Sequence, residues 1–116
     1  MKPKIYGIRN CDTMKKAFAW LEARKIDYDF HDYKKEGVPP GKLEEWASRA
    51  GWEALANTRG PTWRKIPPER RDNPNQARTL ALLAENSSAI RRPIVETGSA
   101  LLVGFDAAKF AAAFER

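Results

Sequence analysis

The chain of 116 residues contains a single cysteine and a single histidine. One cysteine cannot form an internal disulfide, so the sequence excludes a disulfide-stapled fold and an internal resolving thiol. Any redox cycle through this cysteine therefore needs a second thiol from another molecule. We expect no bound metal and no tightly bound cofactor.

Long apolar runs are also missing. No stretch approaches the ~20 apolar residues of a membrane span, and the N-terminus lacks the apolar core of a secretory signal. We therefore expect a soluble, cytoplasmic protein with no membrane contact. The length suits one domain, residues 1–116, with a real hydrophobic core.

Acidic residues are outnumbered, 15 against 21 lysines and arginines, which gives a net charge of +6 and a pI near 9.7. An excess of positive charge favours anionic partners, and nucleic acid is one of them. However, the charges are spread along the whole chain and no nucleic-acid-binding motif is present. A solvated surface is the favoured interpretation, and no specific nucleic-acid binding is expected.

The cysteine, Cys11, lies between a short apolar segment, residues 4–8, and a predicted helix from Asp12 to about Arg24. The helix is indicated by apolar residues spaced along one face: Met14, Ala17, Phe18 and Leu21. At a helix start, unpaired N–H groups and the macrodipole favour a thiolate over a thiol. Cys11 is therefore a candidate reactive thiol. The alternative is a small buried apolar residue, the usual role of a free cysteine.

Three cations, Arg9, Lys15 and Lys16, lie close to Cys11 in the sequence. They add positive charge near the sulfur, but the sequence does not indicate which of them faces it.

A second strand is expected from Ile26 to about His31, because Ile26, Tyr28 and Phe30 alternate with polar residues. Together with the first strand and helix it predicts a parallel β-α-β unit. His31 is one of the polar residues in this alternation, so we expect its side chain at the surface.

The middle of the chain is predicted to be helical, with interruptions. Residues 34–41 suggest a loop, a helix through Trp46 ends at Gly51, and another helix begins at Asn73-Pro74 and ends near Asn86. The loop over residues 57–65 combines turn residues, three cations and an indole. It is either a surface connection or a cradle for an anion.

The C-terminal part predicts a β-β-α unit. Pro93 opens a strand, Gly98-Ser99 forms a hairpin turn to a strand over residues 100–103, and Asp106 caps a last helix. The whole order predicts an α/β fold, with a four-stranded mixed sheet and helices on its faces.

This order, with a cysteine at the first helix start and a strand opened by proline, resembles the thioredoxin fold. Four strings resemble the ArsC/Spx/YffB family of arsenate-reductase-like proteins: Tyr6-x-x-x-x-Cys11, Asn57-Thr58-Arg59-Gly60, Trp63-Arg64 and Ile90-x-Arg92-Pro93-Ile94-Val95. The absence of Cys-x-x-Cys, together with the strings Asn10-Cys11-Asp12-Thr13 and Thr58-Arg59-Gly60, most resembles the YffB-like branch. The likeness covers nearly the whole chain. It also implies a helical insert, about residues 40–88, between the two halves of the fold.

The resemblance implies roles for particular residues. Cys11 is the nucleophile, Pro93 is cis with its backbone beside the sulfur, Arg92 faces the thiolate and its anionic ligand, and Arg59 is a second arginine on the anion side. Guanidinium groups stay charged and lower the pKa of a thiolate, so these roles are physically coherent. Without the resemblance, both arginines would be read as surface charges.

Two further residues are candidates for substrate binding. Asn10 and Thr13 offer hydrogen bonds to the sulfur or its substituent. Both residue types also suit a turn and a first helical residue on structural grounds alone.

The sequence departs at three places from the patterns of the proteins it resembles. Arsenate reductases of this type carry a histidine where this chain has Gly7, and a third arginine soon after the last strand, where residues 103–106 read Val-Gly-Phe-Asp. Spx-type regulators that sense oxidation have a second cysteine where this chain has Met14.

We therefore expect a glutathione-dependent thiol reductase, a thiol-disulfide oxidoreductase with a single nucleophilic cysteine, that uses glutathione as cosubstrate and glutaredoxin as a candidate partner. The alternatives are an Spx-like regulatory module that binds RNA polymerase, and an arsenate reductase with altered anion ligands.

Overall fold

The computed structural model describes residues 2–115, and the chain divides into two compact units. The first unit contains the segments up to Glu36 and from Arg92 onward, and the second contains Gly37–Arg91. The insert expected over about residues 40–88 lies within the second unit.

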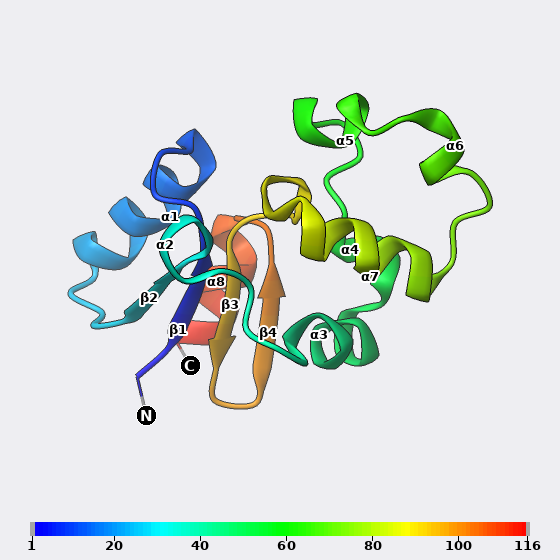
Figure 1. The fold of residues 1–116 in the computed structure, drawn as a ribbon. Coiled ribbons are helices and arrows are strands. Elements are labelled where there is room, and N and C mark those ends of the chain that lie inside the picture. Colours follow the sequence, from blue (N-terminus) through cyan, green and yellow to red (C-terminus); the bar gives the residue numbers. More distant parts are fainter. Residues whose placement is uncertain (1, 116) are drawn as a thin grey trace. The chain divides into compact units, whose positions relative to one another are not determined.

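The first unit is a β-α-β segment joined to a β-β-α segment (Figure 1). Its elements are β1 (Lys4–Gly7), α1 (Asp12–Ala23), β2 (Asp29–Asp32), α2 (Tyr33–Glu36), β3 (Ile94–Thr97), β4 (Ala100–Val103) and α8 (Ala107–Phe114). The sheet order is β2-β1-β3-β4, with β1 parallel to β2 and the other neighbours antiparallel. The predicted four-stranded mixed sheet is confirmed.

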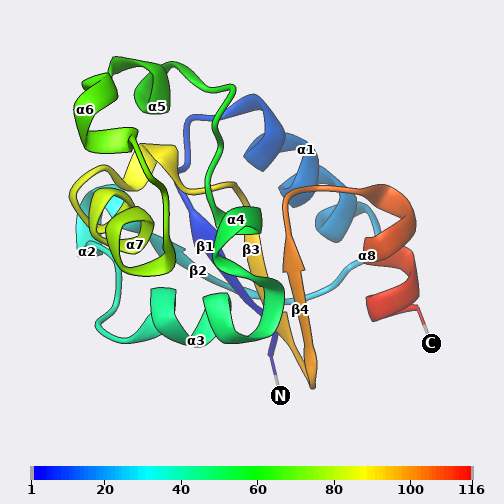
Figure 2. The same cartoon turned by 90° about the vertical axis from the view of Figure 1, so that its right-hand side faces the viewer.

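One face of this sheet carries the core of the first unit. Ile5 of β1 and Val95 of β3 are register partners, and both are fully buried. Helices α1 and α8 lie on that side of the sheet (Figure 2). The helices and the strands contribute the buried cluster of Ile5, Met14, Ala17, Trp20, Leu21, Val95 and Phe110. Each large apolar side chain in such a core contributes roughly 1.5–3 kcal/mol of transfer free energy.

The second unit is helical. It contains α3 (Lys42–Ala50), α4 (Trp52–Leu55), α5 (Pro61–Lys65), α6 (Pro68–Arg71), α7 (Gln76–Glu85) and a 3-10 turn, η1 (Ser87–Ala89). Helix α3 packs against α4 and α7. It ends at Gly51, as predicted, where a φ of 89° suits a residue without a Cβ.

Three local expectations were wrong. The second strand starts at Asp29 rather than Ile26, because Ile26 and Tyr28 pack against the core from the segment before the strand. A helical turn, α2, occupies the start of the expected loop. Helix α7 is capped by Asn75, whose side chain accepts the Arg78 N–H at 2.8 Å, rather than by Asn73, whose φ is 49°.

Within residues 2–115, no helix has both the length and the apolar character needed to cross a membrane.

The last helix supplies a test of the fold. Asp106 caps α8, and its Oδ1 atom accepts the N–H groups of Ala108 at 2.9 Å and Lys109 at 3.1 Å. Replacing Asp106 with alanine should lower the free energy of unfolding by about 1 kcal/mol, measured by urea denaturation, because two N–H groups lose their acceptor. Asp106→Asn is the matched control, since asparagine caps about as well; an equal loss in both variants would contradict this role for the cap.

Candidate active site

Cys11 is the N-cap residue of α1, where the chain passes from extended to helical backbone. Its φ and ψ are −148° and 132°, and its carbonyl oxygen accepts the Lys15 N–H at 2.9 Å, the first hydrogen bond of the helix. Its own N–H donates to the Arg9 carbonyl oxygen at 3.1 Å, which closes the turn after β1. The side chain is partly buried and packs against the core under α1. The predicted position at the helix start is confirmed.

The surroundings of Cys11 favour its thiolate. Burial, the largest single influence, raises the pKa of the thiol, but the opposing influences together outweigh it. The backbone N–H groups of Met14 and Thr13 lower the pKa, and the Arg92 guanidinium lowers it through both a hydrogen bond and its charge. The pKa of Cys11 therefore lies below its ordinary value. The positive end of the α1 macrodipole at this N-cap position also favours the charged sulfur.

Arg92 is the arginine that faces the sulfur. It stands directly before β3, and its peptide bond to Pro93 is cis, as the resemblance implied. Pro93 is buried, and its carbonyl oxygen accepts the Gly104 N–H at 2.8 Å, next to the register pair of Ile94 and Val103. The start of β3 is thereby anchored to the end of β4, and this anchor sets the backbone that carries Arg92.

Tyr33 is a neighbour of Arg92 that the sequence did not reveal. It is 3% exposed, and its hydroxyl has no hydrogen-bond partner within the described residues. Burial raises the pKa of Tyr33, Tyr6 and Glu96 raise it further, and the Arg92 charge lowers it. The phenol therefore lies near the guanidinium, beside the pair in which the Tyr6 hydroxyl donates to Glu96 at 2.9 Å. No sequence pattern marked Tyr33, since it directly follows β2.

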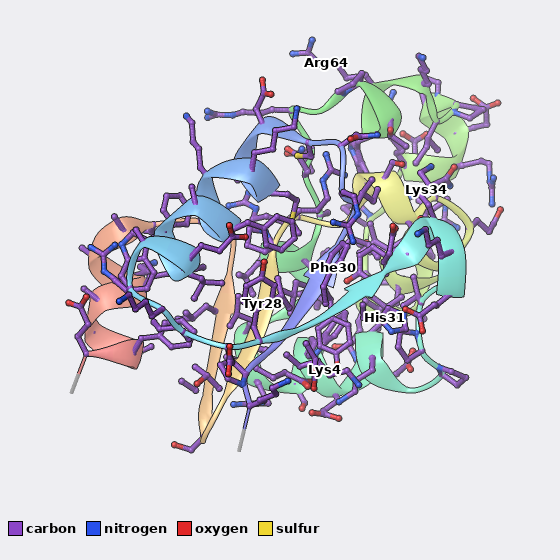
Figure 3. The ribbon with its side chains drawn as sticks, turned by 90° about the vertical axis from the view of Figure 1, so that its left-hand side faces the viewer. Lys4, Tyr28, Phe30, His31, Lys34 and Arg64 are labelled. Atoms are coloured by element: carbon purple, nitrogen blue, oxygen red, sulfur yellow. The ribbon has the colours of Figure 1, made fainter. Side chains whose placement is uncertain are left out.

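The histidine was expected at the surface, and this expectation was wrong. The His31 side chain is only 13% exposed. Its ring lies 5.4 Å from that of Tyr6, its register partner on β1, and its Nδ1 atom is 3.7 Å from Glu36. Figure 3 shows His31 on β2.

The remaining predicted site residues are placed as follows. Asn10 and Thr13 are exposed on either side of Cys11, and Thr13 acts on the sulfur through its backbone. A role for either side chain in binding substrate stays a prediction. Arg59 is exposed and belongs to the second unit, in the turn closed by the Gly60 N–H and the Asn57 carbonyl oxygen at 3.1 Å. Its approach to Cys11 also stays a prediction.

The second unit contains a cavity of about 470 Å³. It is lined by Trp52, Glu53, Ala56, Thr58, Trp63, Pro68, Arg71, Asp72, Pro74 and Thr79. The loop over residues 57–65, considered as an anion cradle, contributes Thr58 and Trp63 to this lining but none of its three cations. A second cavity of about 230 Å³ is lined in part by Thr62 and Lys65 of this loop and by Arg70, so the cradle interpretation stays a prediction.

Metal ligands are not grouped in the part of the chain that the structure describes. No three histidine, cysteine, aspartate or glutamate side chains within residues 2–115 lie close enough together to hold a metal ion.

The pH dependence of Cys11 alkylation tests this description of the thiol. The midpoint of the iodoacetamide rate should lie below the roughly 8.5 of an ordinary cysteine, because the thiolate is the reacting species. Arg92→Gln should move the midpoint up toward that value, since one hydrogen bond and one charge are lost from the sulfur.

Arg91→Gln is the matched control, since it removes the same charge from an exposed neighbour and leaves the backbone bond from the Arg91 N–H to the Leu55 carbonyl oxygen. Equal midpoints in Arg92→Gln and the wild type would contradict the role of Arg92.

Known proteins resemble this chain over almost its whole length. The ArsC family model matches residues 6–113. An uncharacterized protein of Haemophilus influenzae is 37% identical over 95% of this chain and 96% of its own. A solved structure of a YFFB protein is 40% identical, covers 97% of this chain and 98% of its own, and has a TM-score of 0.93. An arsenate reductase (ArsC) related protein from Brucella melitensis is 45% identical, over 100% and 97% of the two chains, with a TM-score of 0.77.

Two more distant similarities bear on fold and function. The global transcriptional regulator Spx 1 of Lactococcus lactis is 26% identical over 88% of this chain and 80% of its own. A glutaredoxin from Archaeoglobus fulgidus is 13% identical with a TM-score of 0.53, a likeness of fold alone. The fold is thus thioredoxin-like, as expected. With nearly the whole chain matched by the family model, this protein belongs to the ArsC family.

Proposed function

We propose that this protein is a glutathione-dependent thiol reductase that acts through Cys11. The observation that carries the proposal is the Arg92 guanidinium on the Cys11 sulfur at a helix N-terminus, because exchange with a disulfide requires a thiolate. The absence of a second cysteine also supports it. A resolving thiol must come from solution, and glutathione or a glutaredoxin can provide it.

The reaction consists of two exchange steps. The Cys11 thiolate attacks the glutathione sulfur of a mixed disulfide between glutathione and a substrate thiol. The Cys11–glutathione bond forms, the original disulfide bond breaks, and the substrate leaves as a thiolate. Reduced glutathione, as its thiolate, then attacks the glutathione sulfur of the adduct, which yields oxidised glutathione and restores the Cys11 thiolate.

Two positions argue against efficient arsenate reduction. A side chain at position 7 would displace Met14, because a Cβ built on Gly7 would lie 2.6 Å from the Met14 Sδ atom. The place of the third arginine is taken by a turn in which Gly104 has a φ of 83° and Asp106 caps α8. Both positions are thus used for packing and backbone geometry. An assay of arsenate reduction with glutathione and glutaredoxin tests this alternative directly.

The similarity to Spx regulators favours one second candidate, a module that binds RNA polymerase. Met14 occupies the position of a second cysteine and is fully buried in the core, so a disulfide switch with Cys11 is absent. Copurification of RNA polymerase subunits with the tagged protein would support this candidate. If the protein is such a module, RNA polymerase subunits should still copurify with the Cys11→Ser variant.

Cys11→Ser provides the main test of the reductase proposal. Wild-type protein treated with oxidised glutathione should gain the mass of one glutathione, and this adduct should disappear on treatment with reduced glutathione. In the presence of reduced glutathione, the wild-type protein should also reduce a glutathionylated peptide faster than reduced glutathione does alone. The product measured is oxidised glutathione. Cys11→Ser should give no adduct and only the uncatalysed rate, since the chain has no other thiol.

Arg92→Gln should retain the adduct but react several-fold more slowly near neutral pH, because less of Cys11 is ionised. Arg91→Gln again serves as the control. Rates in the wild type no higher than in Cys11→Ser would overturn the proposed function.

A further inference from the structure

Arg9 lies on a group of aromatic rings in the first unit. This group, called here the aromatic shelf, consists of Phe18, Tyr28 and Phe30. Phe18 stacks on Tyr28 with 5.4 Å between ring centroids and meets Phe30 edge to face at 5.1 Å. Figure 3 labels Phe30 on β2 and Tyr28 in the segment that leads into it. The Arg9 guanidinium carbon lies 5.0 Å from the Phe30 ring centroid, within the range of a cation–π contact.

The groups that shift the pKa of Cys11 are Met14, Arg92 and Thr13, together with burial, and Arg9 is not among them. Burial and Glu22 raise the pKa of the Tyr28 phenol, and the positive charge of Arg9 lowers it. The sequence left open which nearby cation faces the sulfur. In the structure Arg9 turns to the aromatic shelf and Arg92 faces the sulfur.

Arg9 is nevertheless fixed at the entrance to the helix that carries the thiol. Its carbonyl oxygen accepts the Cys11 N–H at 3.1 Å, and two residues span at most about 7 Å between Cα atoms. The residue is exposed, and its side chain forms no ion pair with any carboxylate in residues 2–115. A guanidinium held on a ring face keeps its charge and loses less rotamer freedom when it binds a planar anion.

We propose that Arg9, held on the aromatic shelf, binds a carboxylate of the substrate and makes Cys11 selective for disulfides that carry carboxylates. The inference rests on the proposed function and specifies its substrate class. Arg92 stabilises the reacting sulfur, whereas Arg9 recognises a charge on the group attached to the attacked sulfur. Glutathione fits this class, because the residues on both sides of its cysteine end in carboxylates.

The expected effect is modest and depends on salt. An exposed ion pair of this kind corresponds to roughly two- to five-fold in rate. Ionic strength of about 1 M shortens the screening length to about 3 Å and should abolish it, whereas about 0.01 M should preserve it. An effect of packing on reactivity would not depend on salt in this way.

The experiment measures the rate at which Cys11 forms a mixed disulfide, by mass spectrometry, with three probes. Oxidised glutathione carries carboxylates, 2-hydroxyethyl disulfide is neutral, and cystamine is cationic. In Arg9→Gln the rate with oxidised glutathione should fall two- to five-fold at low salt. The neutral disulfide should react as in the wild type, and the cationic one at least as fast. The midpoint of the alkylation profile should not move.

Two further variants separate recognition from general charge and from packing. Lys16→Gln removes the same charge from an exposed position on α1 and should leave the preference for oxidised glutathione unchanged. Phe30→Leu keeps an apolar side chain but removes the ring under Arg9, and should lower that preference in part.

Equal slowing of all three probes in Arg9→Gln, or no change with any of them, would overturn the proposed selectivity while leaving the thiol chemistry intact. Failure of the wild type to react with any probe would instead overturn the proposed function.

Discussion

The contact between the Arg92 guanidinium and the Cys11 sulfur is the interaction on which the rest of the site depends. Partial burial of the sulfur opposes ionisation, and the N-terminal N–H groups of α1 act together with Arg92 to reverse that effect. Each partner comes from a different half of the first unit. The β-α-β half supplies the sulfur, and the β-β-α half supplies the arginine at the start of β3. The pairing of β1 with β3 holds the two halves together.

The two arginines near the thiol have different roles. Arg92 stabilises the sulfur itself, and Arg9 lies on Phe30, where its charge remains available to a ligand. The intrinsic nucleophilicity of a thiolate falls as its pKa falls, so a second cation directly on the sulfur would make that sulfur less nucleophilic. Placing that cation on an aromatic ring avoids this cost and adds selectivity for the charge of the substrate.

Much of the fold followed from local sequence signals. Apolar spacing located α1 and α3, Gly98-Ser99 located the hairpin, and Asp106 located the start of α8. The errors arose where tertiary packing decides. The segment from Ile26 to Tyr28 has the alternation of a strand, yet only residues 29–32 pair with β1. The side chains of Ile26 and Tyr28 pack against the core although their backbone lies outside the paired strand.

The site was predictable only in part. Cys11 followed from its place between a strand and a helix, whereas Arg92 required the family resemblance, because nothing in its own sequence surroundings separates it from Arg91. The position of Tyr33 near Arg92 and of Arg9 on Phe30 depends on side-chain directions that sequence spacing does not encode.

The measurement that tests the central claim most directly compares native and urea-unfolded protein in their reaction with oxidised glutathione at about pH 6. In the unfolded chain Cys11 is an ordinary thiol, with well under about 1% present as thiolate at that pH. The native protein should form its single glutathione adduct faster than the unfolded chain does, because the fold stabilises the thiolate. A native rate equal to or below the unfolded rate would contradict the claim that this fold activates Cys11 for exchange.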